Sequence, residues 1–335
     1  MRYFIALAFW LLGTATWALD WEDRQVFGSA DAPNMLRIIS STDTDLFVPI
    51  IQSFLTTNPN VSIEYLVTGT ADLDTRFRDA PTRFDIAISS AMDLQLKLAN
   101  DGYAMTFNDV THPTWANWRQ SLFAFTSEPA AIVINRTAFE GHAIPTSRQD
   151  LIEALRARPE IFQGKVGTYD VRQSGLGYLF ATQDARASET FWRLMEVMGG
   201  LDTRLYCCSG DMIDDLTEGK ITVAYNVLGS YAAARIDAQS PLEIILPSDF
   251  PTTMMRTALV SSETPRPQIA ETFIQHLIAQ QSGSSEAERL LPALQVPGSG
   301  AERATIALEP ALMTFLDSLK RTKFLSEWKA ALIQN

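Results

Sequence analysis

Hydroxyl-rich turns follow three predicted strands of this 335-residue chain, each just before a predicted helix. In chain order these turns contain Ser41, Thr42, Ser89, Ser90, Arg172, Gln173, Ser174 and Gly175. A helix N-terminus offers free backbone N–H groups and partial positive charge, so each turn can bind an anion. In α/β sheets such turns gather at the carboxyl ends of the strands, where ligands bind. Serine and threonine also cap helices, and this structural role is the alternative at each turn.

Arg172 places a guanidinium group in the third turn. Its planar fork matches the oxygen atoms of a phosphate or a carboxylate, which makes it a candidate ligand contact. The alternative is an ordinary surface salt bridge.

No catalytic or metal-binding set emerges from the sequence. The three histidines, His112, His142 and His276, lack metal-type spacing, and the common hydrolase, metalloprotease and P-loop motifs are absent. Asp214 and Asp215 are adjacent on a predicted helix and therefore face different directions. We expect a binding protein without a metal or cofactor, and an exported hydrolase is the less favoured alternative.

Cys207 and Cys208 are the two cysteines of the chain, and they are neighbours. An exported protein meets an oxidising space, in which a vicinal disulfide can form, although the ring it closes is strained. The alternative is a pair of reduced thiols, one of them packed in the core.

The N-terminus predicts a signal peptide at residues 1–18. Arg2 precedes an apolar run at 4–12, and small residues then lead to cleavage after Ala18 or, as second choice, Ala15. This order is typical of export, and the run is shorter than the ~20 apolar residues of a membrane-spanning helix. We therefore expect the mature protein in the periplasm.

The mature chain is acidic. Removal of the signal peptide removes Arg2, which leaves 39 acidic residues against 26 basic ones. A nucleic-acid-binding protein needs a basic surface, so no nucleic-acid partner is expected. Net acidity does not exclude a small anionic solute, because helix N-termini make a cleft locally positive. A mature length of about 317 residues suggests two domains.

Predicted strands and helices alternate from Met35 onward. The first set has strands at 35–40, 61–67 and 84–88, with helices at 46–56 and 92–100. The second set has strands at 165–169 and 221–225, with helices at 188–198 and 212–218. Such alternation is typical of a mostly parallel sheet flanked by helices. The two sets predict two α/β lobes.

Two extended segments are the predicted crossings between the lobes. They lie at 125–129 and 246–251, where no helical periodicity is present. These crossings divide the chain into a loose leader at 19–34, a discontinuous first lobe at 35–124 and 252–335, and a second lobe at 130–245.

Several segments of the chain resemble a known family. They are SSTDTD at 40–45, FDIAISSAMDLQ at 84–95, NDGYA at 100–104, and CCSG at 207–210 through AYNVLG at 224–229. The sequence resembles bacterial extracellular solute-binding proteins of the ABC-transporter type. Within this family it is similar to the branch that contains ferric-iron, sugar-phosphate and phosphoglycerate binding components.

The resemblance implies a type II periplasmic binding fold, in which two lobes joined by two hinge strands close on a ligand. The protein would act as a monomer that presents a small anionic solute to an inner-membrane ABC permease. Regulatory relatives present the ligand to a membrane sensor kinase instead, and this alternative stays open.

The resemblance also places ligand contacts on the three turns described above, and on Tyr225 and Asn226. Ser127 and Asp249, near the predicted hinges, are weaker candidates. Iron-binding members use two consecutive tyrosines near this place, whereas Tyr225 is followed here by Asn226. A phosphorylated or carboxylated small molecule is therefore ranked above ferric iron, which prefers oxygen ligands.

Overall fold

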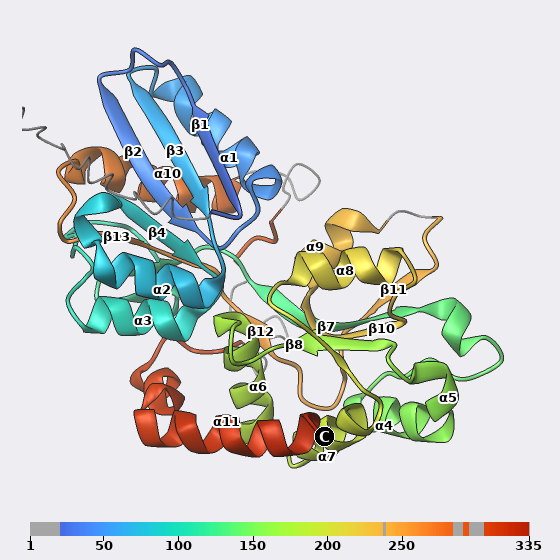
Figure 1. The fold of residues 1–335 in the computed structure, drawn as a ribbon. Coiled ribbons are helices and arrows are strands. Elements are labelled where there is room, and N and C mark those ends of the chain that lie inside the picture. The colour runs from blue at the N-terminus through green and yellow to red at the C-terminus, as the bar shows by residue number, and fades with distance from the viewer. Residues whose placement is uncertain (1–20, 237–238, 284–290, 295–304, 335) are drawn as a thin grey trace, which may run out of the picture.

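A computed structural model describes residues 21–236, 239–283, 291–294 and 305–334. The predicted signal peptide at 1–18 lies outside these residues. The chain forms two lobes, each a sheet flanked by helices (Figure 1). Along the described part of the chain, no helix combines the length and the apolar character needed to cross a membrane.

The sheet of the first lobe has parallel strands at its centre. Its described strands run in the order β1 (Asp23–Phe27), β3 (Val61–Val67), β2 (Asn34–Ser40), β4 (Ile86–Ser89), β13 (Thr257–Val260), β6 (Leu122–Ala124) and β5 (Asn117–Trp118). β2 pairs in parallel with β3 and β4, and the outer pairings are antiparallel. β3 and β4 are buried along their whole length because helices cover the sheet.

The covering helices of the first lobe are α1 (Thr44–Thr57), α2 (Thr70–Asp79), α3 (Met92–Asn100) and α10 (Pro267–Gly283). Short 3-10 turns lie at η1 (Pro81–Arg83) and η2 (Thr114–Ala116). The apolar side of α1 buries Phe47, Ile51 and Phe54, whose spacing of three or four residues is that of one helix face. Burial of this stripe packs α1 against the sheet at β3.

The second lobe repeats the pattern with a smaller sheet. Its strands run in the order β11 (Leu242–Ile245), β7 (Glu128–Asn135), β10 (Val223–Leu228), β8 (Val166–Tyr169) and β9 (Arg204–Tyr206). β8 is parallel to β9 and β10, while β7 is antiparallel to β10 and β11. Its helices are α4 (Arg148–Ala157), α5 (Pro159–Phe162), α6 (Gly175–Ala187), α7 (Thr190–Gly200), α8 (Ser209–Thr217) and α9 (Gly229–Arg235), with a 3-10 turn at η3 (Arg136–Phe139).

The predicted two-lobe α/β class is confirmed, but the sheets are mixed and not mostly parallel. The parallel pairings join β3, β2 and β4 in the first lobe and β10, β8 and β9, at one edge, in the second. The chain passes from β6 to β7 and returns from β12 (Thr253–Met254) to β13. β12 pairs with β7 at Pro129 and Glu128, so the two crossings lie side by side. The second crossing therefore lies at 252–256 and not at the predicted 246–251. The predicted segment stays with the second lobe because Asp249 accepts hydrogen bonds from the backbone and guanidinium of Arg148.

Two further boundaries differ from the prediction. Residues 23–27 of the predicted loose leader form β1, an edge strand whose side chains are mostly exposed, which is why hydrophobic patterning missed it. The C-terminal helix α11 (Ser318–Leu332), which follows a 3-10 segment at η5 (Pro310–Leu316), packs on α7 (Figure 1). Phe324, Trp328 and Leu332 of α11 are buried in the core of the second lobe, not the first.

Candidate functional site

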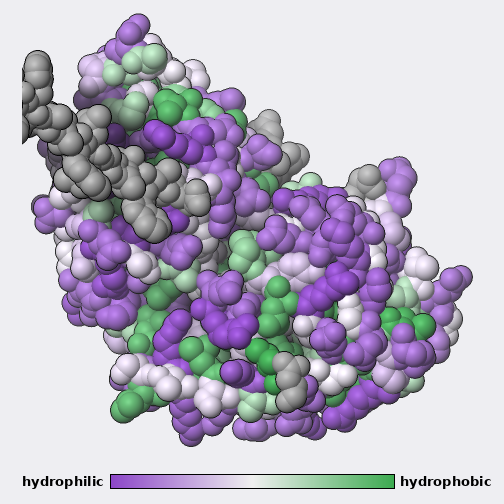
Figure 2. All heavy atoms as spheres, in the orientation of Figure 1, coloured by the Kyte–Doolittle hydropathy of each residue, from purple (hydrophilic) through white to green (hydrophobic). Residues whose placement is uncertain are grey.

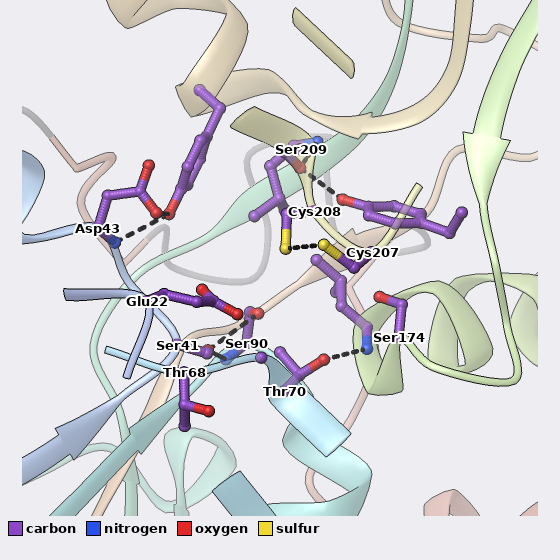
Figure 3. A pocket seen from close by; sticks show the side chains of 15 residues that line it. Glu22, Ser41, Asp43, Thr68, Thr70, Ser90, Ser174, Cys207, Cys208 and Ser209 are labelled. Atoms are coloured by element: carbon purple, nitrogen blue, oxygen red, sulfur yellow. Dashed lines mark hydrogen bonds between the residues drawn. The ribbon is translucent and has the colours of Figure 1, made fainter. Parts of the chain in front are cut away.

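A cavity lies between the two lobes (Figure 3). With its opening to solvent, it has a volume of about 400 Å³. The first lobe lines it with Glu22, Ser41, Asp43, Thr68, Gly69, Thr70 and Ser90, and the second with Tyr169, Ser174, Leu176, Cys207, Cys208, Ser209, Leu228 and Tyr231. The two sets face one another across the lobe boundary, as a site that forms on closure requires.

Two of the predicted turns meet on the first-lobe side of the cavity. Because β2 and β4 are adjacent and parallel, the residues that follow them lie together. The Ser90 backbone N–H donates to the Ser41 hydroxyl at 3.2 Å, and the Ser41 hydroxyl donates to that of Ser89 at 3.3 Å. Ser41 and Ser90 line the cavity, whereas Ser89 and Thr42 are buried behind it.

A third turn on this side was missed by sequence reasoning. Thr68, Gly69 and Thr70 follow β3, the other parallel neighbour of β2, and they line the cavity. The Thr70 hydroxyl accepts a hydrogen bond from the backbone N–H of Leu176 at 3.1 Å, which joins the lobes. The sequence has a hydroxyl-rich turn between a strand and a helix here too, as at the three predicted ligand-binding turns.

The second lobe supplies Ser174 and a row of hydroxyl groups. Ser174 accepts from the backbone N–H of Gly177 and so caps α6. The hydroxyls of Tyr169 and Ser209 are 2.5 Å apart, and Ser209 also accepts from the Leu228 backbone N–H. These side chains come from the ends of β8 and β10 and from the start of α8, so the strand ends again carry the site.

Asp43 holds the lobes together at another point. Its backbone N–H donates to the Tyr231 hydroxyl, which in turn donates to the Asp43 carboxylate, each at 3.2 Å. Arg235 approaches the same carboxylate at 3.5 Å. Together with the bond from Leu176 to Thr70, these contacts show the lobes in a closed arrangement.

Five helices of nine or more residues begin at the cavity. The residues that precede their first turns are Asp43 for α1, Gly69 for α2, Ala91 for α3, Ser174 for α6 and Cys208 for α8. Of these helices, α6 has a side-chain cap, and the other four have none. The N-terminal N–H groups and dipoles of helices from both lobes thus converge on one space.

The charged side chains of the cavity are acidic. Among the described residues, its lining includes Glu22 and Asp43 but no lysine, arginine or histidine. The pKa of the Glu22 carboxyl is raised, first by partial burial and then by neighbouring carboxylates, those of Asp43, Asp211 and Asp72. A hydrogen bond from the backbone of Gly69 acts in the opposite direction. Figure 2 shows a mostly hydrophilic surface over the part of the second lobe where α8 and α9 lie.

Arg172 lies outside the cavity lining. Its guanidinium pairs with Asp170 at 2.6 Å and stands 5.9 Å from the ring of Trp328, with 43% of its side chain exposed. Gln173 is exposed, while Gly175 packs against Leu94 and Thr70 of the first lobe. Arg172 therefore forms a surface salt bridge in this structure, which was the alternative to a ligand contact. Its guanidinium pairs with the carboxylate of Asp170, two residues away.

Tyr225, Asn226 and Asp249 belong to a buried polar network and do not line the cavity. Arg148 and Asp184, both with fully buried side chains, form its centre and pair at 3.1 Å. The Tyr225 hydroxyl accepts from Arg148 and donates to Asp184, each at 2.7 Å, and Asn226 donates to Asp184 at 2.8 Å. The polar atoms that suggested ligand contacts are therefore used to neutralise a buried charge pair.

Asn226 has the backbone torsion φ +63°, at a bulge where the register of β10 against β7 shifts. The bulge re-aims this side chain toward Asp184.

A second buried pair lies at the crossings. Arg256 donates to both carboxylate oxygens of Glu128, at 2.9 and 3.0 Å, and also to the Thr42 hydroxyl. Thr126 and Ser230 donate to the same carboxylate. Burial by itself raises the pKa of Glu128, but the Arg256 charge and these hydrogen bonds outweigh it and lower the pKa.

Because Arg256 donates to the Thr42 hydroxyl, Thr42 contacts the crossings between the lobes and does not line the cavity. Ser127 is likewise buried between Thr126 and Glu128 and does not line the cavity.

The sulfur atoms of Cys207 and Cys208 lie 2.6 Å apart in the cavity wall. Asp211 is 3.5 Å from the Cys207 sulfur. Across the described residues, this trio is the one group of histidine, cysteine, aspartate or glutamate side chains whose ligand atoms all lie within 4.8 Å of one another. Two sulfur ligands favour soft metals, not ferric iron.

Comparisons with known proteins agree with this geometry. The model of a family described as bacterial extracellular solute-binding protein matches residues 85–306, more than half of the chain. The search of curated proteins finds no match.

Solved structures give the same architecture. The substrate-binding protein of an ABC transporter from Agrobacterium tumefaciens is 29% identical, with a TM-score of 0.86, and the match covers 92% of this chain and 98% of that one. The periplasmic binding protein AfuA of Actinobacillus pleuropneumoniae, solved with fructose-6-phosphate, has a TM-score of 0.73 at 13% identity and covers 90% and 100%. Iron-bound HitA of Pseudomonas aeruginosa has a TM-score of 0.63 at 14% identity and covers 89% and 99%. The predicted type II binding fold is confirmed.

Proposed function

The chain belongs to the bacterial extracellular solute-binding proteins, and from this premise we propose that it captures a small molecule with a phosphate or carboxylate group. The lobes close on this anion, and the closed form presents it to an ABC permease. The observation that carries the proposal is the convergence of five helix N-termini, from both lobes, on the interlobe cavity.

The helix N-termini explain both binding and closure. Each helix dipole places about half a positive charge at this end, so an anion between them is stabilised without any basic side chain. In α6 the N–H groups of Leu176 and Gly177 already donate to Thr70 and Ser174, so this helix acts on the anion through its dipole. The same holds for α3, where the Met92 N–H donates to the Ser90 carbonyl. Without an anion, the partial positive charges of α1, α2 and α3 oppose those of α6 and α8 as the lobes approach. A ligand that removes this repulsion favours the closed state, which is the condition for shifting the equilibrium.

The acidic side chains define what the rest of the ligand must offer. Glu22 and Asp43 line the same cavity and accept hydrogen bonds. A ligand that is anionic throughout is repelled there, whereas hydroxyl or ammonium groups donate to these carboxylates. The favoured class is therefore a metabolite with one anionic group and several hydrogen-bond donors, such as a phosphorylated polyol.

Ferric iron is the alternative ligand that the solved relatives raise. Two features of the site disfavour it. Tyr225 is held by Arg148 and Asp184 and is 1% exposed, so it is not free to bind a metal. The compact group of ligand atoms in the wall contains two sulfur atoms, which suit softer cations.

A sensor kinase would recognise the same closed form as a permease does. A gene deletion distinguishes the sensing role from transport. Deletion of the gene is expected to abolish uptake of the ligand. Intact uptake with loss of a transcriptional response would favour the sensing role. Turnover of the bound ligand by the purified protein would instead favour the exported hydrolase.

The direct test is thermal unfolding of residues 19–335 with a panel of ligands. The panel contains sugar phosphates, phosphoglycerates, phosphonates, di- and tricarboxylates and ferric iron, with the unphosphorylated sugars as matched controls. A ligand present at 100 times its dissociation constant stabilises the fold by about 2.7 kcal/mol. We expect a shift with a phosphorylated or carboxylated member and none with its neutral control. A shift with iron alone, or equal shifts with the neutral sugars, would overturn the proposal.

A further inference from the structure

The adjacent cysteines form part of the cavity wall in a way that the proposed function does not use. Cys207 and Cys208 lie between the end of β9 and the start of α8. Figure 3 shows both sulfur atoms in the cavity wall, across from Ser41 and Ser90. We propose that Cys207 and Cys208 form a vicinal disulfide in the exported protein, and that this disulfide is the redox-sensitive part of the ligand-contacting wall.

The pairing follows from placement and compartment. The chain has two cysteines, so neither has another partner within the molecule. Their sulfur atoms already lie 2.6 Å apart. Proteins of this family are extracellular, where thiols oxidise readily. In the step, two thiols lose two protons and two electrons to the disulfide of a thiol oxidant, whose own sulfur–sulfur bond is reduced to two thiols.

The oxidation state changes the charge of the wall. In the reduced form, the hydrogen bond from Cys208 lowers the pKa of the Cys207 thiol, although partial burial and the Asp211 carboxylate oppose the shift. A thiolate here would add a negative charge beside Glu22, Asp43 and Asp211. The disulfide cannot ionise, so oxidation keeps this side of the cavity compatible with an anion.

The disulfide also restrains the turn that carries α8. Cys208 is the residue that precedes the first turn of this helix, whose N-terminus faces the cavity. A bond to Cys207 limits the backbone torsions of the turn, so less conformational freedom is lost when a ligand binds. The small ring is strained, and strain makes a disulfide easier to reduce. The wall therefore responds to reductant while the rest of the fold does not.

The first test concerns the bond alone and needs no ligand. The mature protein is purified from the periplasm without reductant and treated with iodoacetamide under denaturing conditions. Its mass is expected to be lower than that of the dithiol by two hydrogen atoms, with no adduct, and two adducts should appear after reduction. Two adducts without reductant, or a disulfide-linked dimer on a non-reducing gel, would overturn the proposal.

The second test concerns the role in binding, which rests on the proposed function. Affinity for the anionic ligand found in the panel is measured by calorimetry for oxidised protein, reduced protein and the Cys207→Ser/Cys208→Ser variant. Reduced protein is expected to bind about fivefold more weakly at pH 9 than at pH 6, because a thiolate repels the ligand anion. The serine variant cannot form a thiolate and should lack this difference.

The outcomes separate the two proposals. Equal affinity of oxidised and reduced protein at both pH values would overturn the role of the cysteines in binding and leave the proposed function standing. Failure of every anion in the panel to bind any form would instead overturn the proposed function, while the mass measurement still decides whether the bond exists.

Discussion

The interlobe cavity and the Arg148 network are built from the same kinds of residue but serve opposite purposes. In the network, Asp184 receives hydrogen bonds from four side chains, those of Arg148, Tyr225, Asn226 and Thr252. In the cavity, four helix N-termini lack side-chain caps, and Glu22 faces solvent without a basic partner in the lining. Saturated polar groups stabilise the fold, whereas unsaturated ones remain available to a ligand.

Substitution Asp184→Asn should give the largest effect on stability and thereby test the structural half of this comparison. The change leaves Arg148 buried without its fully buried counter-charge, and breaking such a pair costs about 3–5 kcal/mol. Urea unfolding of the mature protein measures the loss. Asp79→Asn, at an exposed position of α2, is the matched control and should change stability by less than about 0.5 kcal/mol.

The same comparison requires that the folded fraction of Asp184→Asn still binds ligand. If the variant does not fold, Tyr225→Phe removes one bond of the network at a cost of about 1 kcal/mol and should leave affinity unchanged. A large loss of affinity at unchanged stability would place the network in the binding site.

The crossing pair should give a smaller and pH-dependent effect. Glu128→Gln leaves Arg256 buried without a counter-charge and should cost about 3 kcal/mol at pH 7. The pKa of Glu128 is lowered on folding, so its ionisation adds stability above the ordinary glutamate pKa. This contribution is lost as pH falls through the lowered value in the folded protein.

Urea unfolding at pH 7 and at pH 3 tests the pair. The difference between wild type and Glu128→Gln should shrink as pH falls, because protonation removes the same charge. A difference that is constant with pH would show that Glu128 acts through packing alone.

Loss of one hydroxyl at the lobe boundary should reduce binding without a comparable effect on folding. Thr70→Val removes the acceptor of the Leu176 backbone N–H, a bond between the lobes. We expect affinity to fall about fivefold, equivalent to about 1 kcal/mol for one hydrogen bond. Thr75→Val, whose hydroxyl bonds within α2, is the control and should bind normally. Equal losses in the two variants would point to helix stability and not to closure.

Arg172→Ala should give the smallest effect. Its guanidinium is paired at the surface with Asp170, and such pairs contribute less than about 1 kcal/mol. Affinity measured by calorimetry should stay within twofold of wild type by the same reasoning. A loss of tenfold or more would mean that Arg172 turns into the cavity when ligand is present.

Local signals were read well from the sequence, and long-range pairing was not. The apolar spacing in α1, and the hydroxyl turns at Ser41 and Ser90, are properties of a few neighbouring residues. Asp184, the buried partner of Arg148, lies 36 residues from it along the chain, and no local pattern connects the two residues. Tyr225, 77 residues from Arg148, therefore looked free in the sequence although the fold uses it.

One edge strand was missed and one helix was assigned to the wrong lobe for a related reason. β1 is held by backbone pairing to β3, and its exposed side chains carry no alternation. The predicted first lobe at 252–335 included α11 because it followed the order of the chain, whereas Phe324 and Trp328 of this helix pack in the core of the second lobe. The turn at Thr68–Thr70 was overlooked even though its hydroxyl groups followed the pattern used elsewhere.

The crossings determine how the lobes can move. Where β7 and β12 lie side by side, the chain also passes a third time, since Thr305 bridges to Thr253 and Ile306 bonds to its carbonyl. Within the described residues, these three segments are joined to one another by backbone pairing, and we expect this pairing to restrict twisting of one lobe against the other. A ligand too bulky for the closed arrangement would hold the lobes apart, so size is expected to select the ligand in addition to its charge and its hydrogen-bond donors.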